Sequence, residues 1–290
     1  MNYHVRHSTT LSYPAPVALA KFNLRLVPAP WPGQTVGEYA LRIVPPPSSR
    51  EDLAGPYCVN TTRIGFQFPL EELEVISEVK VSVTGPPEPG AGPLLAEVRS
   101  EALAQRDISA ISPAPYLFAS RIAALNVEIG DWAAASLAAD SGIVAAASAL
   151  MNMIHREFTY KSGVTDSATP PLEAFHKRKG VCQDFAHIMI MALRAHGIPA
   201  GYASGYLRTD PPPGKPRLVG ADAMHAWVNV WCGSEQGWVA FDPTNDCLAH
   251  EDHIQIGMGR DYADVAPIDG TFIGTDLQDM DTSVDVECSP

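Results

Sequence analysis

Polar and apolar residues alternate along short runs in the first 85 residues. The run Glu78–Val83 carries Val at every second position, which is the period of a strand with one buried face. Breaks rich in Pro and Gly separate such runs, as at Pro28–Gly33 and Gly85–Gly92. We therefore expect an antiparallel β-rich domain over residues 1–85, with the second break as its boundary.

Helical spacing replaces this alternation further along the chain. Leu94–Ala104 is rich in Ala, Leu and Glu, and apolar residues recur every three or four positions from Gly142 to Phe158. A more apolar helix is predicted over Cys182–His196, because Gly197 suits a left-handed C-terminal position and Pro199 follows it. The face expected to be buried in the second helix consists of Ile143, Ala147, Leu150 and Ile154.

Short strands are predicted after the apolar helix, over Tyr202–Leu207, Met224–Cys232 and Gly237–Asp242. The loop Thr209–Asp222 is too rich in Pro to extend a sheet, so it is free to border a cleft. The fold class is therefore α+β: an N-terminal antiparallel β domain, a helical segment, and a core in which a helix packs on an antiparallel sheet.

Three segments follow from these patterns. Residues 1–85 form the β-rich domain, and residues 86–270 form the helical region with the core. Residues 271–290 are an acidic C-terminal segment in which Thr282–Glu287 alternates and is able to return to a sheet as a strand.

The composition restricts the class of protein. Twenty Lys and Arg against 33 Asp and Glu give a net charge of −13, which argues against a nucleic-acid partner. No apolar run approaches the ~18 residues of a membrane span, and the first residues do not resemble a secretory signal. The five cysteines have no C-x-x-C spacing, which favours free thiols over disulfides or a zinc site. We expect a folded cytoplasmic protein without a membrane partner.

Cys182 is the first candidate for chemistry, because it lies at the start of the predicted apolar helix. A helix N-terminus offers unpaired N–H groups and the positive end of the macrodipole, which both favour a thiolate. The basic run His176–Lys179 lies just upstream; it is better interpreted as the C-terminal end of a short helix than as part of a site.

His225 and Asp242 supply the other two groups of a thiol-based triad. A two-residue turn at Gly233-Ser234 would pair them directly, whereas a longer turn through Gly237 would leave them diagonal neighbours. An imidazole held by a carboxylate can take a proton from a thiol and later deliver it to a leaving amine.

Five segments carry a resemblance to a known family: GVCQDFAH, GIPAGYASGYL, MHAWVNVW, GWVAFDPTN and GRDYADVAP resemble the bacterial transglutaminase-like family, whose core is shared with papain-like thiol enzymes. The resemblance covers residues 145 to 270, and the first 85 residues are similar to the family's N-terminal domain. It implies that Cys182 is the nucleophile, His225 the general base and Asp242 the orienting acid.

One position departs from the family pattern. The family commonly has an Arg where this chain has Gly201, so any contact made by that Arg is in doubt, but the triad is not. Calcium-dependent members are more distant relatives, and no calcium-loop motif occurs here. We expect neither a metal nor another cofactor.

Other site residues are predicted from weaker signals. The backbone N–H of Cys182 is one oxyanion donor, and the side chain of Gln183 or Tyr160 is a second, although Tyr160 is more typical of a core aromatic. Trp227 and Tyr206 are candidate substrate contacts, and packing explains Trp227 equally well.

These residues favour a cysteine enzyme of acyl transfer that acts on a peptide or protein substrate carrying an amide. The thioester is resolved by water in a peptidase or amidase, which we favour, or by an amine in a transglutaminase. A scaffold that binds peptides without turnover is the hypothesis from another class.

Overall fold

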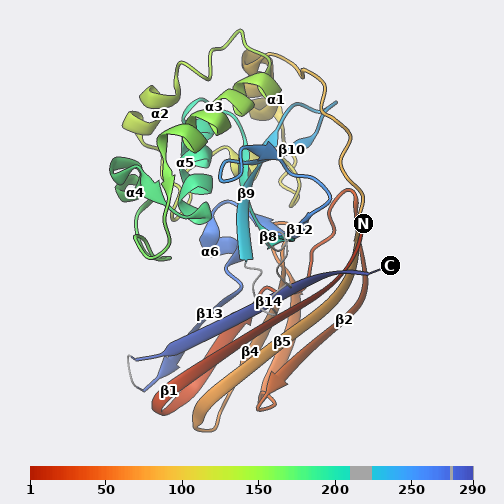
Figure 1. Ribbon diagram of the computed structural model, residues 1–290, viewed down its shortest axis with the longest axis vertical. Helices are drawn as coiled ribbons and strands as arrows, with labels where there is room; N and C mark the ends of the chain where they lie inside the picture. Colours follow the sequence, from red (N-terminus) through yellow and green to blue (C-terminus); the bar gives the residue numbers. More distant parts are fainter. Residues whose placement is uncertain (210–223, 275–276, 290) are drawn as a thin grey trace, which may run out of the picture.

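The β-rich domain is a bent sheet that the end of the chain completes. The computed structural model describes residues 1–209, 224–274 and 277–289. The first half of β1 (Asn2–Leu24) pairs with β5 (Leu70–Val83) and β14 (Asp279–Ser289), and its second half pairs with β4 (Asn60–Gly65) and β13 (Ile268–Ile273). The acidic C-terminal segment therefore contributes strands to the N-terminal domain (Figure 1).

Two further strands extend this sheet. β2 (Gln34–Val44) pairs with β5, and β3 (Ser49–Ala54) pairs with β4, which gives the order β2-β5-β1-β4-β3. In β5 the three valines of the run Glu78–Val83 are buried, as their alternation predicts. The two halves of the bent sheet enclose an apolar cluster that includes Leu11, Phe22, Ile64 and Leu73.

A five-stranded antiparallel sheet and the helices form the second part of the molecule, drawn above the bent sheet in Figure 1. The strand order is β11 (Cys247–Leu248), β10 (Trp238–Asp242), β9 (Met224–Trp231), β8 (Ala200–Leu207) and β12 (His253–Gly259). Two short segments, β6 (Thr159–Tyr160) and β7 (Lys179–Gly180), form a separate parallel pair.

The central helix is α5 (Cys182–Ala195), which packs on β8 and β9 and is buried along nearly its whole length. It ends where the sequence predicts, since Gly197 has a φ of +76° that suits a residue without a Cβ. The other helical elements are α1 (Leu95–Ala104), the 3₁₀ turn η1 (Ala114–Tyr116), α2 (Val127–Ala133), α3 (Ile143–Glu157), α4 (Pro171–Lys177) and α6 (Tyr262–Val265).

Two predicted features of these helices are confirmed. The four apolar residues predicted for one face of α3 are fully buried, and the helix begins after Gly142. Of the basic residues upstream of Cys182, His176 and Lys177 end α4 and Arg178 is its capping residue with a φ of +52°, whereas Lys179 begins β7. The predicted loop Thr209–Asp222 lies outside the described residues after Thr209. Within the described residues, no helix has the length and apolar character needed to cross a membrane.

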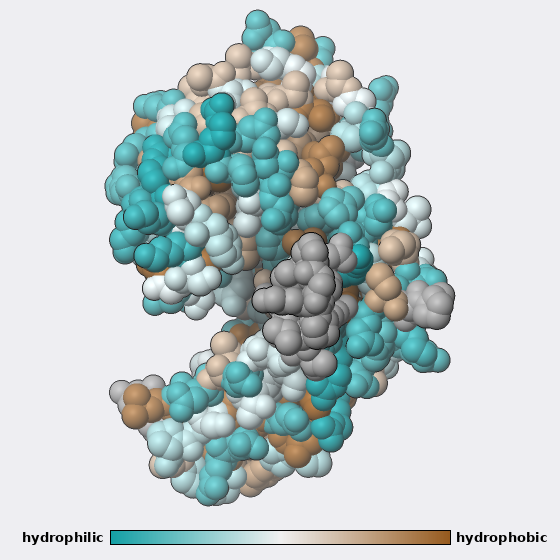
Figure 2. Space-filling model, in the orientation of Figure 1, coloured by the Kyte–Doolittle hydropathy of each residue, from teal (hydrophilic) through white to brown (hydrophobic). Residues whose placement is uncertain are grey.

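The bent sheet and the core meet through an apolar cluster formed by both parts. Val5, Val81 and Val286 of the bent sheet pack with Tyr206 and Ile254 of the core. Hydrogen bonds join the same surfaces: the Tyr3 hydroxyl donates to Asp252 at 2.7 Å, and the Gln34 side chain exchanges two hydrogen bonds with the Gln255 backbone. Beside this contact, Figure 2 shows a hollow in the surface between the two parts.

Candidate active site

Cys182 is the first residue of α5 and is partly exposed, whereas Cys58 and Cys232 are buried. The turn before it is held by Asp184, whose Oδ2 accepts hydrogen bonds from the Val181 N–H at 2.8 Å and from the Thr165 hydroxyl at 2.7 Å. These bonds satisfy a backbone donor that the helix itself leaves free.

Gly180 is required for this turn. A Cβ at that position would lie 2.5 Å from the Asp184 Oδ2, which is closer than any ordinary contact. The glycine of the GVCQDFAH segment therefore lets the carboxylate reach the start of α5, where it fixes the backbone beside Cys182.

The longer of the two predicted turns brings His225 and Asp242 together. Trp231 pairs with Trp238, so the six residues Cys232–Gly237 join β9 to β10 and the two-residue turn is wrong. The loop closes where the Cys232 N–H donates to the Gly237 carbonyl at 2.8 Å. His225 and Asp242 are diagonal neighbours.

The His225 imidazole lies between Cys182 and Asp242. Its Nε2 is 2.7 Å from the Asp242 Oδ2, and the ring also interacts with the Cys182 side chain. Burial lowers the pKa of His225, but its interactions with Asp242 and Cys182 outweigh that effect and raise the pKa to about 10. The contacts around the ring therefore favour its imidazolium form.

Asp242 is fully buried, yet every contact around it favours the carboxylate. Its Oδ1 accepts the N–H groups of Thr244 at 2.9 Å and Asn245 at 3.2 Å, and its Oδ2 accepts the Asn245 side-chain amide at 2.7 Å. Burial raises the pKa of Asp242, but these donors and His225 hold the pKa well below its usual range. The carboxylate stays charged and keeps a fixed orientation.

Two family models and several known proteins are similar to this chain. The family model described as the transglutaminase-like superfamily matches residues 131–243, and the bacterial transglutaminase-like N-terminal region matches residues 3–82. An uncharacterised protein of Mycobacterium tuberculosis is 35% identical over 291 residues, which cover 98% of this chain and 92% of that protein. The chain belongs to the transglutaminase-like superfamily.

Two further relatives show how far this likeness extends. A protein-glutamine gamma-glutamyltransferase of Pseudomonas aeruginosa is 38% identical over 101 residues, which cover 34% of this chain and 15% of that protein. A solved structure from Cytophaga hutchinsonii, whose name proposes a cysteine protease, superposes with a TM-score of 0.76 at 19% identity, covering 99% of this chain and 90% of that one. This likeness shows the fold, and the superfamily supports a cysteine-dependent enzyme.

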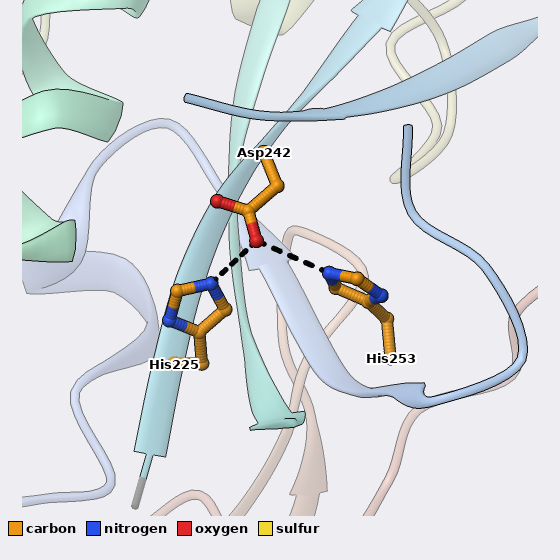
Figure 3. Close-up of side chains that lie close together, drawn as sticks. All are labelled: His225, Asp242 and His253. Carbon is orange, nitrogen blue, oxygen red and sulfur yellow. Dashed lines mark hydrogen bonds and ion pairs between the residues drawn. The ribbon is translucent and has the colours of Figure 1, made fainter. Parts of the chain in front are cut away.

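This transglutaminase-like chain has a second imidazole at the carboxylate, from His253 at the start of β12 (Figure 3). The His253 Nε2 lies 3.2 Å from the Asp242 Oδ2, so two rings from different strands converge on one oxygen atom. His253 is not predictable as part of this site from the sequence. No local motif marks it, because it meets Asp242 only when β12 has crossed to the far side of β8.

His225, Asp242 and His253 are near enough to suggest a metal site. The hydrogen bonds argue against one, because the His253 Nδ1 accepts the His250 N–H at 3.3 Å. A neutral ring whose Nδ1 is an acceptor carries its proton on Nε2, so that nitrogen has no lone pair for a metal. The two histidines and Asp242 therefore fit a carboxylate that accepts hydrogen bonds better than they fit a set of metal ligands.

Tyr160 is not the core aromatic that its sequence context favoured. Tyr160 is 53% exposed, and Phe158 occupies the core instead. β6 pairs Tyr160 with Gly180, two residues before Cys182, so the phenol lies near the Cys182 thiol. Gln183 is partly exposed in the first turn of α5. Both residues remain candidates for an oxyanion donor.

The two predicted substrate contacts are buried. Trp227 and Tyr206 are each 1% exposed, so neither presents a surface that a substrate can touch in this state. The Trp227 ring packs against both imidazoles that bond Asp242, with centroids 6.2 Å from His225 and 5.3 Å from His253. Tyr206 instead bonds His7 at 2.9 Å. Their position supports packing rather than recognition.

Gly201 has no room for the Arg common in the family. A Cβ there would lie 2.7 Å from the Met258 sulfur and 3.3 Å from the Tyr116 ring. The guanidinium of Arg194 in α5 is buried next to this position and donates to the carbonyl oxygens of Ala200, Phe118 and Arg260. The core beside Gly201 is therefore already filled by other side chains, and the absence of the family's Arg does not affect Cys182, His225 or Asp242.

Proposed function

We propose that this protein is a cysteine-dependent acyl-transfer enzyme that attacks an amide or peptide carbonyl through Cys182. One observation carries the proposal: the partly exposed Cys182 at the N-terminus of α5 interacts with His225, and the Nε2 of His225 is hydrogen-bonded to the buried Asp242. The arrangement is suited to a thiolate beside an imidazolium.

The residues supply each step of the reaction. The Cys182 thiolate attacks the carbonyl carbon, and the His225 imidazolium gives its proton to the departing amine as the C–N bond breaks. A thioester on Cys182 remains. The neutral His225 then takes a proton from an attacking water, and the C–S bond breaks to release a carboxylic acid. Asp242 orients the ring and stabilises its charged form throughout.

The tetrahedral intermediate needs donors for its oxyanion. The backbone N–H of Cys182 is unpaired within α5, as the first amides of any helix are. A side-chain donor completes the pair in this proposal, and Tyr160 and Gln183 both border the nucleophile. The exposure of the Tyr160 residue favours it as the group that meets substrate.

Water is the favoured acceptor, which makes the protein a peptidase or amidase. Transfer to an amine is the second candidate, since the P. aeruginosa relative is named as a protein-glutamine gamma-glutamyltransferase and the matched stretch is 38% identical. The two activities share the thioester and differ only in what resolves it. A peptide-binding scaffold without turnover is the third candidate.

Intact-mass measurement of the protein mixed with glutamine-containing and general peptides tests the proposal. We expect an acyl adduct that Cys182→Ser abolishes and that Cys247→Ser, a control at another partly exposed cysteine, leaves in place. Added amine that is incorporated into the peptide would identify transfer, and free acid alone would identify hydrolysis. Absence of adduct and of any product with every peptide would favour the scaffold.

A further inference from the structure

We propose that His253 is a positioning residue that holds the Asp242 carboxylate in line with His225. The role rests on the proposed function, since it matters only if His225 takes part in acyl transfer. None of the contacts described for His253 involves Cys182, and it acts through Asp242. The inference extends the triad to a fourth side chain on a separate strand.

The hydrogen bonds of the His253 ring define its tautomer. The backbone N–H of His250 donates to the Nδ1 of the His253 ring, and the backbone N–H of His253 donates to the His250 carbonyl at 3.0 Å. The ring proton is therefore on Nε2, where it donates to the Asp242 Oδ2. Only 2% of the His253 side chain is exposed, so water does not compete for this bond.

The two imidazoles on Asp242 differ in charge. Burial lowers the pKa of His253, and the charges of His225 and His250 act in the same direction, against the opposing effect of Asp242. The pKa of His225 is raised. One carboxylate thus holds an imidazolium on one side and a neutral donor on the other, which leaves the mobile proton on the ring beside Cys182.

Packing fixes the His253 ring in this orientation. Trp227 meets it edge to face at 5.3 Å between centroids, and His250 meets it at 4.7 Å with the ring planes perpendicular. Trp227 also packs against His225. The buried tryptophan therefore spaces the two imidazoles, and their nitrogens reach the same oxygen from opposite sides (Figure 3).

Two substitutions separate the donor from the ring. His253→Phe keeps an aromatic ring against Trp227 but removes the Nε2 proton, whereas His253→Gln keeps an N–H donor of similar reach. The readout is the rate of iodoacetamide alkylation of Cys182 at pH 7, followed by peptide mass mapping. We expect about a tenfold fall for His253→Phe, the effect of one hydrogen bond to a charged group, and recovery to within about threefold for His253→Gln.

A double-mutant cycle with Asp242→Asn tests the route of the effect. If His253 acts through the carboxylate, His253→Phe slows the Asp242→Asn protein by less than about twofold, whereas an independent packing effect would multiply with it. Equal rates for wild type and His253→Phe, or full additivity, would overturn the inference. Slow Cys182 alkylation in the wild-type protein, no faster than that of Cys247, would instead count against the proposed function.

Nitrogen-15 NMR of the wild-type protein tests the tautomer without any substitution, and therefore without dependence on folding of a variant. We expect a protonated Nε2 and an unprotonated Nδ1 on His253 from pH 6 to 8, with His225 doubly protonated. A proton on the His253 Nδ1 would overturn the inference, because Nε2 could not then donate to Asp242.

Discussion

Replacing Asp242 by Asn removes the charge that holds His225 as an imidazolium while nearly preserving the shape of the side chain. The substituted amide can still accept the Thr244 and Asn245 N–H groups on its oxygen. It cannot stabilise a cationic ring as a carboxylate does. The change therefore isolates the electrostatic role of Asp242 from its role in the turn after β10.

The size of the effect follows from the histidines of this molecule. His225 has its pKa raised from 6.5 to about 10, which corresponds to about 5 kcal/mol in favour of the imidazolium, shared between Asp242 and Cys182. Burial lowers the pKa of His7 and His187 to about 4, and neither of these rings bonds a carboxylate in the contacts described. We therefore expect the pKa of His225 to fall below about 7 in Asp242→Asn.

Histidine NMR titration from pH 4 to 11 measures this shift directly. Asp246→Asn is a matched control, because Asp246 lies four residues along and bonds Asn152 rather than His225. Iodoacetamide alkylation of Cys182 provides the functional readout. In the wild-type protein the alkylation rate should change little between pH 8 and pH 6. In Asp242→Asn the rate at pH 6 should be up to about 100-fold lower than the rate at pH 8, as expected for a thiol without an imidazolium beside it. A wild-type His225 that titrates near 6.5, or a substituted one that still titrates above 8, would refute the reasoning.

Three other outcomes are expected. Gly205→Ala should lower the free energy of unfolding in urea by about 3 kcal/mol, since its Cβ would lie 2.2 Å from the Ile254 carbonyl oxygen; a loss below about 1 kcal/mol would contradict that packing. Arg194→Met should cost about 3–5 kcal/mol in the same assay because it removes the donors to the carbonyl oxygens of Ala200 and Arg260. Arg42→Met at an exposed ion pair should cost under about 1 kcal/mol, and equal losses would argue against the buried network. Because the pKa of His225 is raised, its stabilisation is complete below pH 6.5 and is lost as pH rises through about 10, so the thermal midpoint should fall across that range in wild type and less in Asp242→Asn.

Features encoded by neighbouring residues were predictable from the sequence. The bounds of α5 follow from its apolar run and from Gly197 and Pro199, and the structure ends the helix there. The position of Cys182 at the start of this helix distinguished it from the other four cysteines. The alternation of polar and apolar residues in β5 predicted which valines of that strand are buried. In each case a local conformational preference and the tertiary structure agree.

Features that depend on distant segments were not predictable in the same way. Turn composition alone left the β9–β10 register open, because Gly233 and Gly237 both adopt positive φ and either allows a turn. Tyr160 is exposed because β6 carries it beside β7, a pairing that its sequence neighbours do not indicate. His253 becomes a partner of Asp242 only through the order of five strands.

The pairing of β1 with β14 has a consequence for synthesis on the ribosome. β1 is translated long before β14, whose residues bond one edge of β1, from Asn2 opposite Ser289 to Ser12 opposite Asp279. Until they arrive, that edge presents unpaired amide and carbonyl groups to any other extended chain. Nascent chains stalled before residue 279 should therefore associate with one another more readily than chains that include β14, which covers that edge.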